Sequence, residues 1–125
     1  MTIALWCVLA AAFLHLPFAI AAKSGKGFSN ARPRAYLEAL EGWRQRAQWT
    51  QLNSLENFPI FAAAVIICHL LAGANDSANL LALAFVALRL VYGLLYIANL
   101  ATLRSLTWMA AQACVVGLFV IAARA

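Results

Sequence analysis

Residues 78–101 read ANLLALAFVALRLVYGLLYIANLA, and Arg89 is the only charged residue among them. A helix of this length is about 36 Å long, which is enough to cross the ~30 Å hydrocarbon core of a bilayer. The stretch shows no polar/apolar alternation with a period of two, so it is not typical of a membrane β-barrel strand. This segment therefore predicts a chain that crosses a membrane as helices.

Three further apolar stretches have the same character, at residues 2–22, 58–74 and 106–123. The 125 residues are 66% hydrophobic and only 10% charged, whereas a soluble domain is roughly 45–50% apolar and about 25% charged. We therefore expect an all-α fold, a membrane-spanning four-helix bundle formed by one domain over residues 1–125. The expected spans are about 2–22, 46–74, 78–101 and 104–123.

The polar segment 35–51 is rich in Ala, Leu, Glu, Gln and Arg. These residues favour helix. We expect the segment to be helical outside the membrane and to continue directly into the second span.

The basic residues are concentrated in the loop between the first two spans. Six of the nine lie there: Lys23, Lys26, Arg32, Arg34, Arg44 and Arg46. The formal charge of +5 would suit a nucleic-acid partner, but this clustering is instead typical of the positive-inside rule. It predicts a cytoplasmic first loop, termini on the outer side, and a cytoplasmic turn near Arg104. Membrane lipid, and no nucleic acid, is the expected partner.

The cysteines and histidines do not form a recognisable site. Cys7, Cys68 and Cys114 are isolated in apolar spans, so we expect neither a disulfide framework nor a metal site. His15 and His69 each stand alone on an apolar helix, where packing or a helix–helix hydrogen bond is the expected role.

Polar residues recur at helical spacing on two of the expected spans. The second span carries Arg46, Asn53 and Glu56, and the third carries Arg89, Tyr92, Tyr96 and Asn99. Residues three, four or seven positions apart share one face of a helix. A charged residue at mid-span costs about 2.5–3.5 kcal/mol on insertion scales, so these faces are not expected to contact lipid. The predicted topology puts both in the cytoplasmic half of the membrane.

The residues by themselves leave two interpretations open. In the first, the two polar faces converge on a binding pocket. In the second, Glu56 and Arg89 form an internal salt bridge and the tyrosines serve as anchors at the membrane interface.

Residues 46–59, RAQWTQLNSLENFP, resemble the signature of the MAPEG family, the membrane-associated proteins in eicosanoid and glutathione metabolism. The resemblance covers essentially the whole chain. It includes the basic first loop, the Asn-x-x-Glu-Asn-x-Pro core, the Arg-x-x-Tyr-x-x-x-Tyr pattern that starts at Arg89, and the Arg104-Ser105 pair at the start of the fourth span. It implies a homotrimer of four-helix protomers, with glutathione bound between neighbouring protomers near the cytoplasmic face.

The same resemblance implies roles for individual residues. Arg104 matches the arginine that stabilises the glutathione thiolate, and Ser105 is an alternative contact to the thiol. The residues that match glutathione-binding positions are Lys23, Arg46, Asn53, Glu56, Arg89, Tyr92 and Tyr96. Glu56 suits the ammonium group. With a thiol pKa near 8.5, only about 3% of glutathione is thiolate at neutral pH, and lowering that pKa by two units raises the fraction roughly 25-fold. A guanidinium can supply this shift because it remains charged and donates hydrogen bonds.

Two positions depart from the eicosanoid enzymes of the family. Trp49 stands where those enzymes carry an arginine, and Arg46, one turn earlier, is a possible substitute. Asn57 stands where leukotriene C synthases carry a tyrosine. Both differences argue against eicosanoid specificity.

The expected function is therefore that of a glutathione-binding integral membrane protein, of bacterial type and located in the inner membrane. It is expected to act as a glutathione transferase or peroxidase on small lipophilic electrophiles, through a stabilised thiolate. A non-catalytic membrane protein of the same fold is the alternative. A small four-helix drug/proton antiporter is less favoured. Proteins of that class require a deeply buried carboxylate as the coupling site, typically in the first helix, and the first span here has none.

Overall fold

The computed structural model describes residues 1–125 and contains six helices and no strand. They are α1 (Ile3–Phe13), α2 (His15–Lys23), α3 (Pro33–Glu38), α4 (Gly42–Ala72), α5 (Asp76–Ile97) and α6 (Ala101–Ala123). Together α1 and α2 make one apolar span, and four helical spans in all are long and apolar enough to cross a membrane. The expected all-α four-helix bundle is thereby confirmed.

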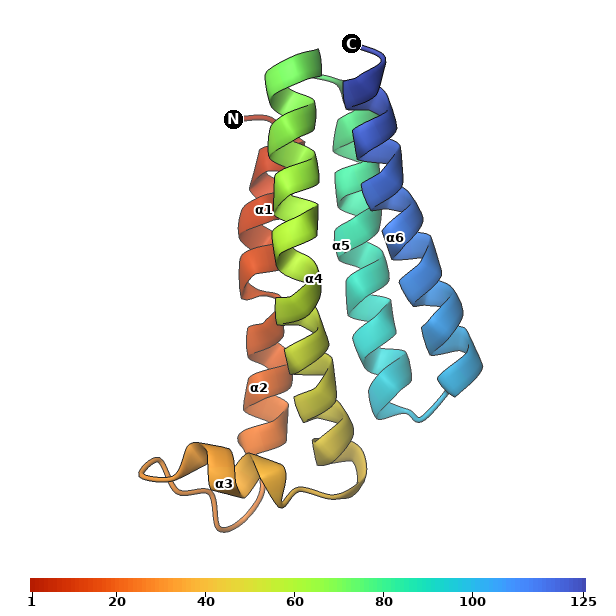
Figure 1. The fold of residues 1–125 in the computed structure, drawn as a ribbon. Coiled ribbons are helices and arrows are strands. Elements are labelled where there is room, and N and C mark those ends of the chain that lie inside the picture. The colour runs from red at the N-terminus through yellow and green to blue at the C-terminus, as the bar shows by residue number, and fades with distance from the viewer.

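The four spans run alternately up and down, side by side (Figure 1). Both termini lie at one end of the bundle, whereas α3 and the α5–α6 turn lie at the other. Within the bundle α4 packs against the first span, α5 and α6, and α5 packs against α1 and α6. The basic first loop and the turn before Arg104 consequently share one end of the molecule.

The first span is interrupted at Leu14, between α1 and α2, and Pro17 explains the interruption. A proline has no N–H to donate to the carbonyl four residues earlier, here that of Phe13, and its ring crowds that carbonyl. Beyond the interruption, Phe18 is buried against Gly93 of α5, where an added Cβ would lie 2.1 Å from the Phe18 ring. The absence of a side chain at Gly93 therefore lets α2 approach α5.

The segment 35–51 is not one helix, so that prediction was wrong. The structure breaks it between α3 and α4. Gly42, the first residue of α4, has a φ of 66°, a conformation that is cheap only for glycine, and the chain turns there as it enters α4. From that point α4 continues without interruption through Pro59 to Ala72.

The turn between α5 and α6 also differs from the expected spans 78–101 and 104–123. The helix α5 ends at Ile97, α6 begins at Ala101, and Asn99 lies between them with a φ of 61°. Asn99 is therefore in the turn rather than on the polar face of α5. Arg46 Nε donates a hydrogen bond of 3.0 Å to the carbonyl oxygen of Ile97, which satisfies one of the free carbonyls at the end of α5.

The core is built mainly from small residues with one aromatic pair. Phe61 of α4 stacks on Phe85 of α5, with ring centroids 3.9 Å apart. Cys7, Cys68 and Cys114 are buried as free thiols among alanines of the same core. Small side chains allow close helix approach, which is how helices associate in a bilayer.

This arrangement makes a prediction about sidedness. Ser24 and the C-terminus lie at opposite ends of the bundle, so Ser24→Cys and a cysteine added after Ala125 should react with a membrane-impermeant maleimide from opposite sides of the membrane. Ser77→Cys, at the start of α5, should label with the C-terminus. The native thiols are buried and should not react with the maleimide. Labelling of Ser24→Cys and the C-terminal cysteine from one side would contradict the bundle's topology.

Candidate functional site

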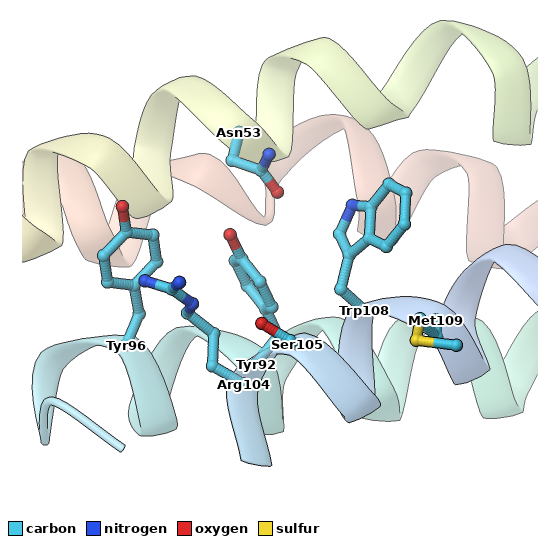
Figure 2. A pocket seen from close by; sticks show the side chains of 7 residues that line it. All are labelled: Asn53, Tyr92, Tyr96, Arg104, Ser105, Trp108 and Met109. Atoms are coloured by element: carbon cyan, nitrogen blue, oxygen red, sulfur yellow. The ribbon is translucent and has the colours of Figure 1, made fainter. Parts of the chain in front are cut away.

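A cavity of about 450 Å³ opens between α4, α5 and α6, in the half of the bundle near the α5–α6 turn (Figure 2). Its lining residues are Asn53, Tyr92, Tyr96, Arg104, Ser105, Trp108 and Met109. In Figure 2 Asn53 of α4 points across the space towards the side chains of α5 and α6.

A second hollow of about 370 Å³ adjoins the first along α4. It shares Asn53, Tyr92 and Tyr96 with the larger cavity and adds Trp49, Leu52 and Glu56. We call the two hollows together the groove. Six of the nine residues predicted for the site line it: Asn53, Glu56, Tyr92, Tyr96, Arg104 and Ser105.

Helical spacing places these side chains on common faces. Asn53 and Glu56 are three residues apart on α4, and Tyr92 and Tyr96 are four apart on α5. Residues at these spacings are neighbours on the helix surface. The antiparallel arrangement of α4, α5 and α6 then brings three such faces to the same level of the bundle.

Arg89 lies behind the groove and is almost completely buried, with 1% of its surface exposed. Its Nη2 donates a 2.7 Å hydrogen bond to Asn53 Oδ1, and its guanidinium carbon lies 4.2 Å from the centroid of the Tyr92 ring. Glu56 is exposed and accepts a hydrogen bond of 3.4 Å from Asn53 Nδ2. The structure thus pairs Arg89 with Asn53, and the proposed Glu56–Arg89 salt bridge is not formed.

Asn53 is held in place by a chain of amide hydrogen bonds. Asn57 Nδ2 donates to the Asn53 carbonyl oxygen at 2.8 Å and to Asn53 Oδ1 at 3.2 Å. Gln112 Nε2 of α6 in turn donates to Asn57 Oδ1 at 2.5 Å. The Asn53 oxygen therefore accepts from two donors, which turns its NH₂ group towards Glu56.

Arg104 forms the cationic edge of the groove. Its guanidinium carbon lies 4.3 Å from the centroid of the Tyr96 ring, and the Tyr96 ring stands perpendicular to that of Tyr92 at 5.7 Å. Ser105 beside it is exposed. Arg89 lies behind the two tyrosines and Arg104 beside them, so the groove presents the Arg104 guanidinium, the Glu56 carboxylate and several hydrogen-bonding groups. This combination suits a ligand that carries both charges.

Three predicted site residues do not line the groove, and one of them is Arg89, which lies behind it. Lys23 lies over the Phe28 ring at 5.7 Å, in the loop. Arg46 is engaged at the end of α5, with the Ile97 carbonyl.

Three residues of α6 were missed by the sequence reasoning. Trp108 and Met109 line the groove, and Gln112 anchors Asn57. Gln112 carried a usable signal, because it is a lone amide within an apolar span and lies eight residues, about two turns, beyond Arg104. No group of three or more His, Cys, Asp or Glu side chains is arranged to hold a metal ion.

The Arg89–Asn53 bond makes a prediction about stability. Asn53→Ala leaves the guanidinium buried without this acceptor and should lower the free energy of unfolding by about 1.5–3 kcal/mol. In an Arg89→Met background Asn53→Ala should lower the free energy of unfolding by a clearly smaller amount, since no buried charge remains. Denaturant unfolding in detergent measures both, and Asn53→Asp, which keeps an acceptor, is the control. Equal costs in the two backgrounds would show that the bond contributes nothing.

The family model of MAPEG matches residues 3–124, nearly the full length of the chain. No similar curated protein or solved structure was found. The match agrees with the four apolar spans. This multi-pass integral membrane protein therefore belongs to the MAPEG family.

Proposed function

We propose that the protein binds glutathione in the groove and either joins it through its sulfur to a small lipophilic electrophile or uses it to reduce that electrophile. One observation supports this most: Arg104 and Ser105 line the same cavity as Asn53, Tyr92 and Tyr96, although they come from three helices. Cavities of about 450 and 370 Å³ fall within the ~300–1,000 Å³ typical of small-ligand sites.

The charges of the groove suit the charges of glutathione, which carries two carboxylates, one ammonium and a thiol. Glu56 is exposed at the rim and is the acceptor for the ammonium. Asn53 and Tyr92 supply hydrogen bonds to the peptide, the Tyr96 ring lines the same hollow, and Arg89 acts by fixing Asn53. Lys23 and Arg46 lie outside the groove of their own protomer, and we assign them to the glutathione bound at a neighbouring protomer's boundary.

The proposed chemistry is nucleophilic attack by a stabilised thiolate. Arg104 lowers the pKa of the thiol by electrostatic attraction and hydrogen bonding, and the thiol proton passes to water. The sulfur lone pair then forms a bond to the electrophilic carbon while the leaving group departs with its bonding electrons. Trp108 and Met109 give one end of the cavity an apolar wall, which suits a substrate that enters from the bilayer.

A non-catalytic role has one observation in its favour. The Gln112–Asn57–Asn53–Arg89 hydrogen bonds join α6, α4 and α5, so these polar residues also serve helix packing. Titration calorimetry of glutathione into the detergent-solubilised protein separates the two roles, because a purely structural network binds no glutathione.

The location we propose is a bacterial inner membrane with the first loop in the cytoplasm. Seven of the nine basic residues lie at the loop end of the bundle, counting Arg104 with the six of the loop. The positive-inside rule places that end in the cytoplasm. The side from which Ser24→Cys reacts decides this orientation.

We further propose a homotrimer in which neighbouring protomers cover the groove. Glu56 is exposed and Arg104 is half-buried on the outside of a single protomer, where contact with lipid is costly. Native mass spectrometry in mild detergent should therefore show three chains. Spectra with monomer or dimer alone would rule the trimer out.

The roles assigned to Arg104 and Glu56 can be separated by kinetics. Arg104→Ala should slow conjugation of an aryl halide at neutral pH by about 10- to 150-fold, because it loses a charge-assisted interaction of about 1.5–3 kcal/mol. Higher pH should partly restore the rate, since bulk ionisation then supplies thiolate. Glu56→Gln should weaken glutathione binding and leave the pKa of the bound thiol nearly unchanged.

Arg124→Ala is the matched control, because Arg124 lies at the far end of the bundle. It should keep the wild-type pH–rate profile. A wild-type profile for Arg104→Ala as well would move the thiolate role to another group, with Ser105 as the next residue to test.

A further inference from the structure

The Arg104 guanidinium, which we propose stabilises the glutathione thiolate, contacts an aromatic ring and forms no side-chain hydrogen bond. None of the side-chain hydrogen bonds in the structure involves Arg104, and its side chain is only half-buried. Its guanidinium carbon lies 4.3 Å from the centroid of the Tyr96 ring. A cation–π contact uses no acceptor atom, so the five N–H donors of the guanidinium remain available to a ligand.

The Tyr96 ring is itself fixed from two sides. Tyr92, one turn earlier on α5, meets it edge to face at 5.7 Å and an interplanar angle of 90°. Trp49 of α4 lies at 6.2 Å with its plane tilted by 45°. Aromatic pairs at such distances are mutually attractive. The contact to Arg104 is therefore made by a ring whose orientation two helices determine.

We propose that Tyr96, supported by Trp49, is a positioning residue that holds the Arg104 guanidinium at the groove through its ring face. This inference rests on the proposed function, because the guanidinium is held where the glutathione thiolate would bind. A long arginine side chain has many rotamers, and holding it before the ligand arrives removes that ordering cost from binding and catalysis. Trp49, which the glutathione-binding roles did not use, thereby acquires a function.

The ring and the hydroxyl of Tyr96 can be tested separately. Tyr96→Phe keeps the ring face and removes the hydroxyl, whereas Tyr96→Leu removes the ring face and keeps an apolar side chain. A role in positioning predicts that Tyr96→Phe behaves as wild type. A role through a hydroxyl contact to glutathione predicts that both variants lose activity.

The first measurement needs no glutathione. The δ-methylene protons of Arg104 over an aromatic ring experience a ring-current shift, and their NMR signal is identified by its loss in Arg104→Lys. We expect the shift in wild type and Tyr96→Phe and its loss in Tyr96→Leu. An unshifted signal in wild type, or a shift that survives in Tyr96→Leu, would overturn the proposed contact.

The second measurement follows the bound thiol. Tyr96→Leu should raise its pKa, measured by thiolate absorbance against pH, and slow conjugation at neutral pH by about 3- to 30-fold. The rate should recover as the pH rises, with the KM for glutathione little changed. Tyr96→Phe should stay within about twofold of wild type. Equal losses in both variants, or an unchanged thiol pKa in Tyr96→Leu, would overturn the positioning role.

Two further results keep the inference separate from folding and from the proposed function. If Tyr96→Leu does not fold, Trp49→Leu replaces it, with Trp43→Leu as a control of similar exposure, 41% against 44%. The Trp49 variant should weaken the ring-current shift and the Trp43 variant should not; identical behaviour of the two would refute the support from Trp49.

If wild type binds no glutathione, the proposed function fails, while the ring-current measurement still decides the Arg104–Tyr96 contact.

Discussion

The hydrogen bond between Arg89 and Asn53 is the interaction on which the polar part of this bundle depends. A guanidinium with 1% exposure in an apolar bundle needs a partner, because a buried unpaired charge is strongly destabilising. The structure supplies a neutral amide oxygen at 2.7 Å in place of a carboxylate. Asn53 in turn is held by Asn57, and Asn57 by Gln112. One buried charge thus fixes the relative positions of α4, α5 and α6.

The choice of an amide has a consequence for the groove. Had Glu56 neutralised Arg89, it would have been drawn inward and its charge lost to ligands. Because Asn53 takes that place, Glu56 remains exposed at the rim. The groove therefore presents a free carboxylate at one edge and the Arg104 guanidinium at another. A zwitterionic peptide that carries a thiol matches this separation of charges, and this match underlies the proposed function.

Backbone features at a few positions determine where the groove lies. Pro17 accounts for the interruption of the first span, and Gly93 leaves room for the Phe18 ring against α5. Gly42 turns the chain so that α4 starts after the loop, and Asn99 reverses it between α5 and α6. The turn at Asn99 places Arg104 on the neighbouring helix α6, with its guanidinium carbon 4.3 Å from the centroid of the Tyr96 ring. The groove lies between α4, α5 and α6 in the half of the bundle near the α5–α6 turn.

The sequence alone determined the four spans, because a run of about 20 apolar residues is by itself long enough to cross the hydrocarbon core of a bilayer as a helix. It also determined which residues share a helix face, since that depends only on the 3.6-residue period, and six of the nine candidate residues do meet at the groove. Contacts between helices were decided by the tertiary structure. Arg89 meets Asn53 and leaves Glu56 free, Arg46 reaches the Ile97 carbonyl, and Trp108 completes the cavity. Each of these contacts depends on the register between helices and on the exact ends of α4 and α5, neither of which is fixed by residue spacing within a single helix.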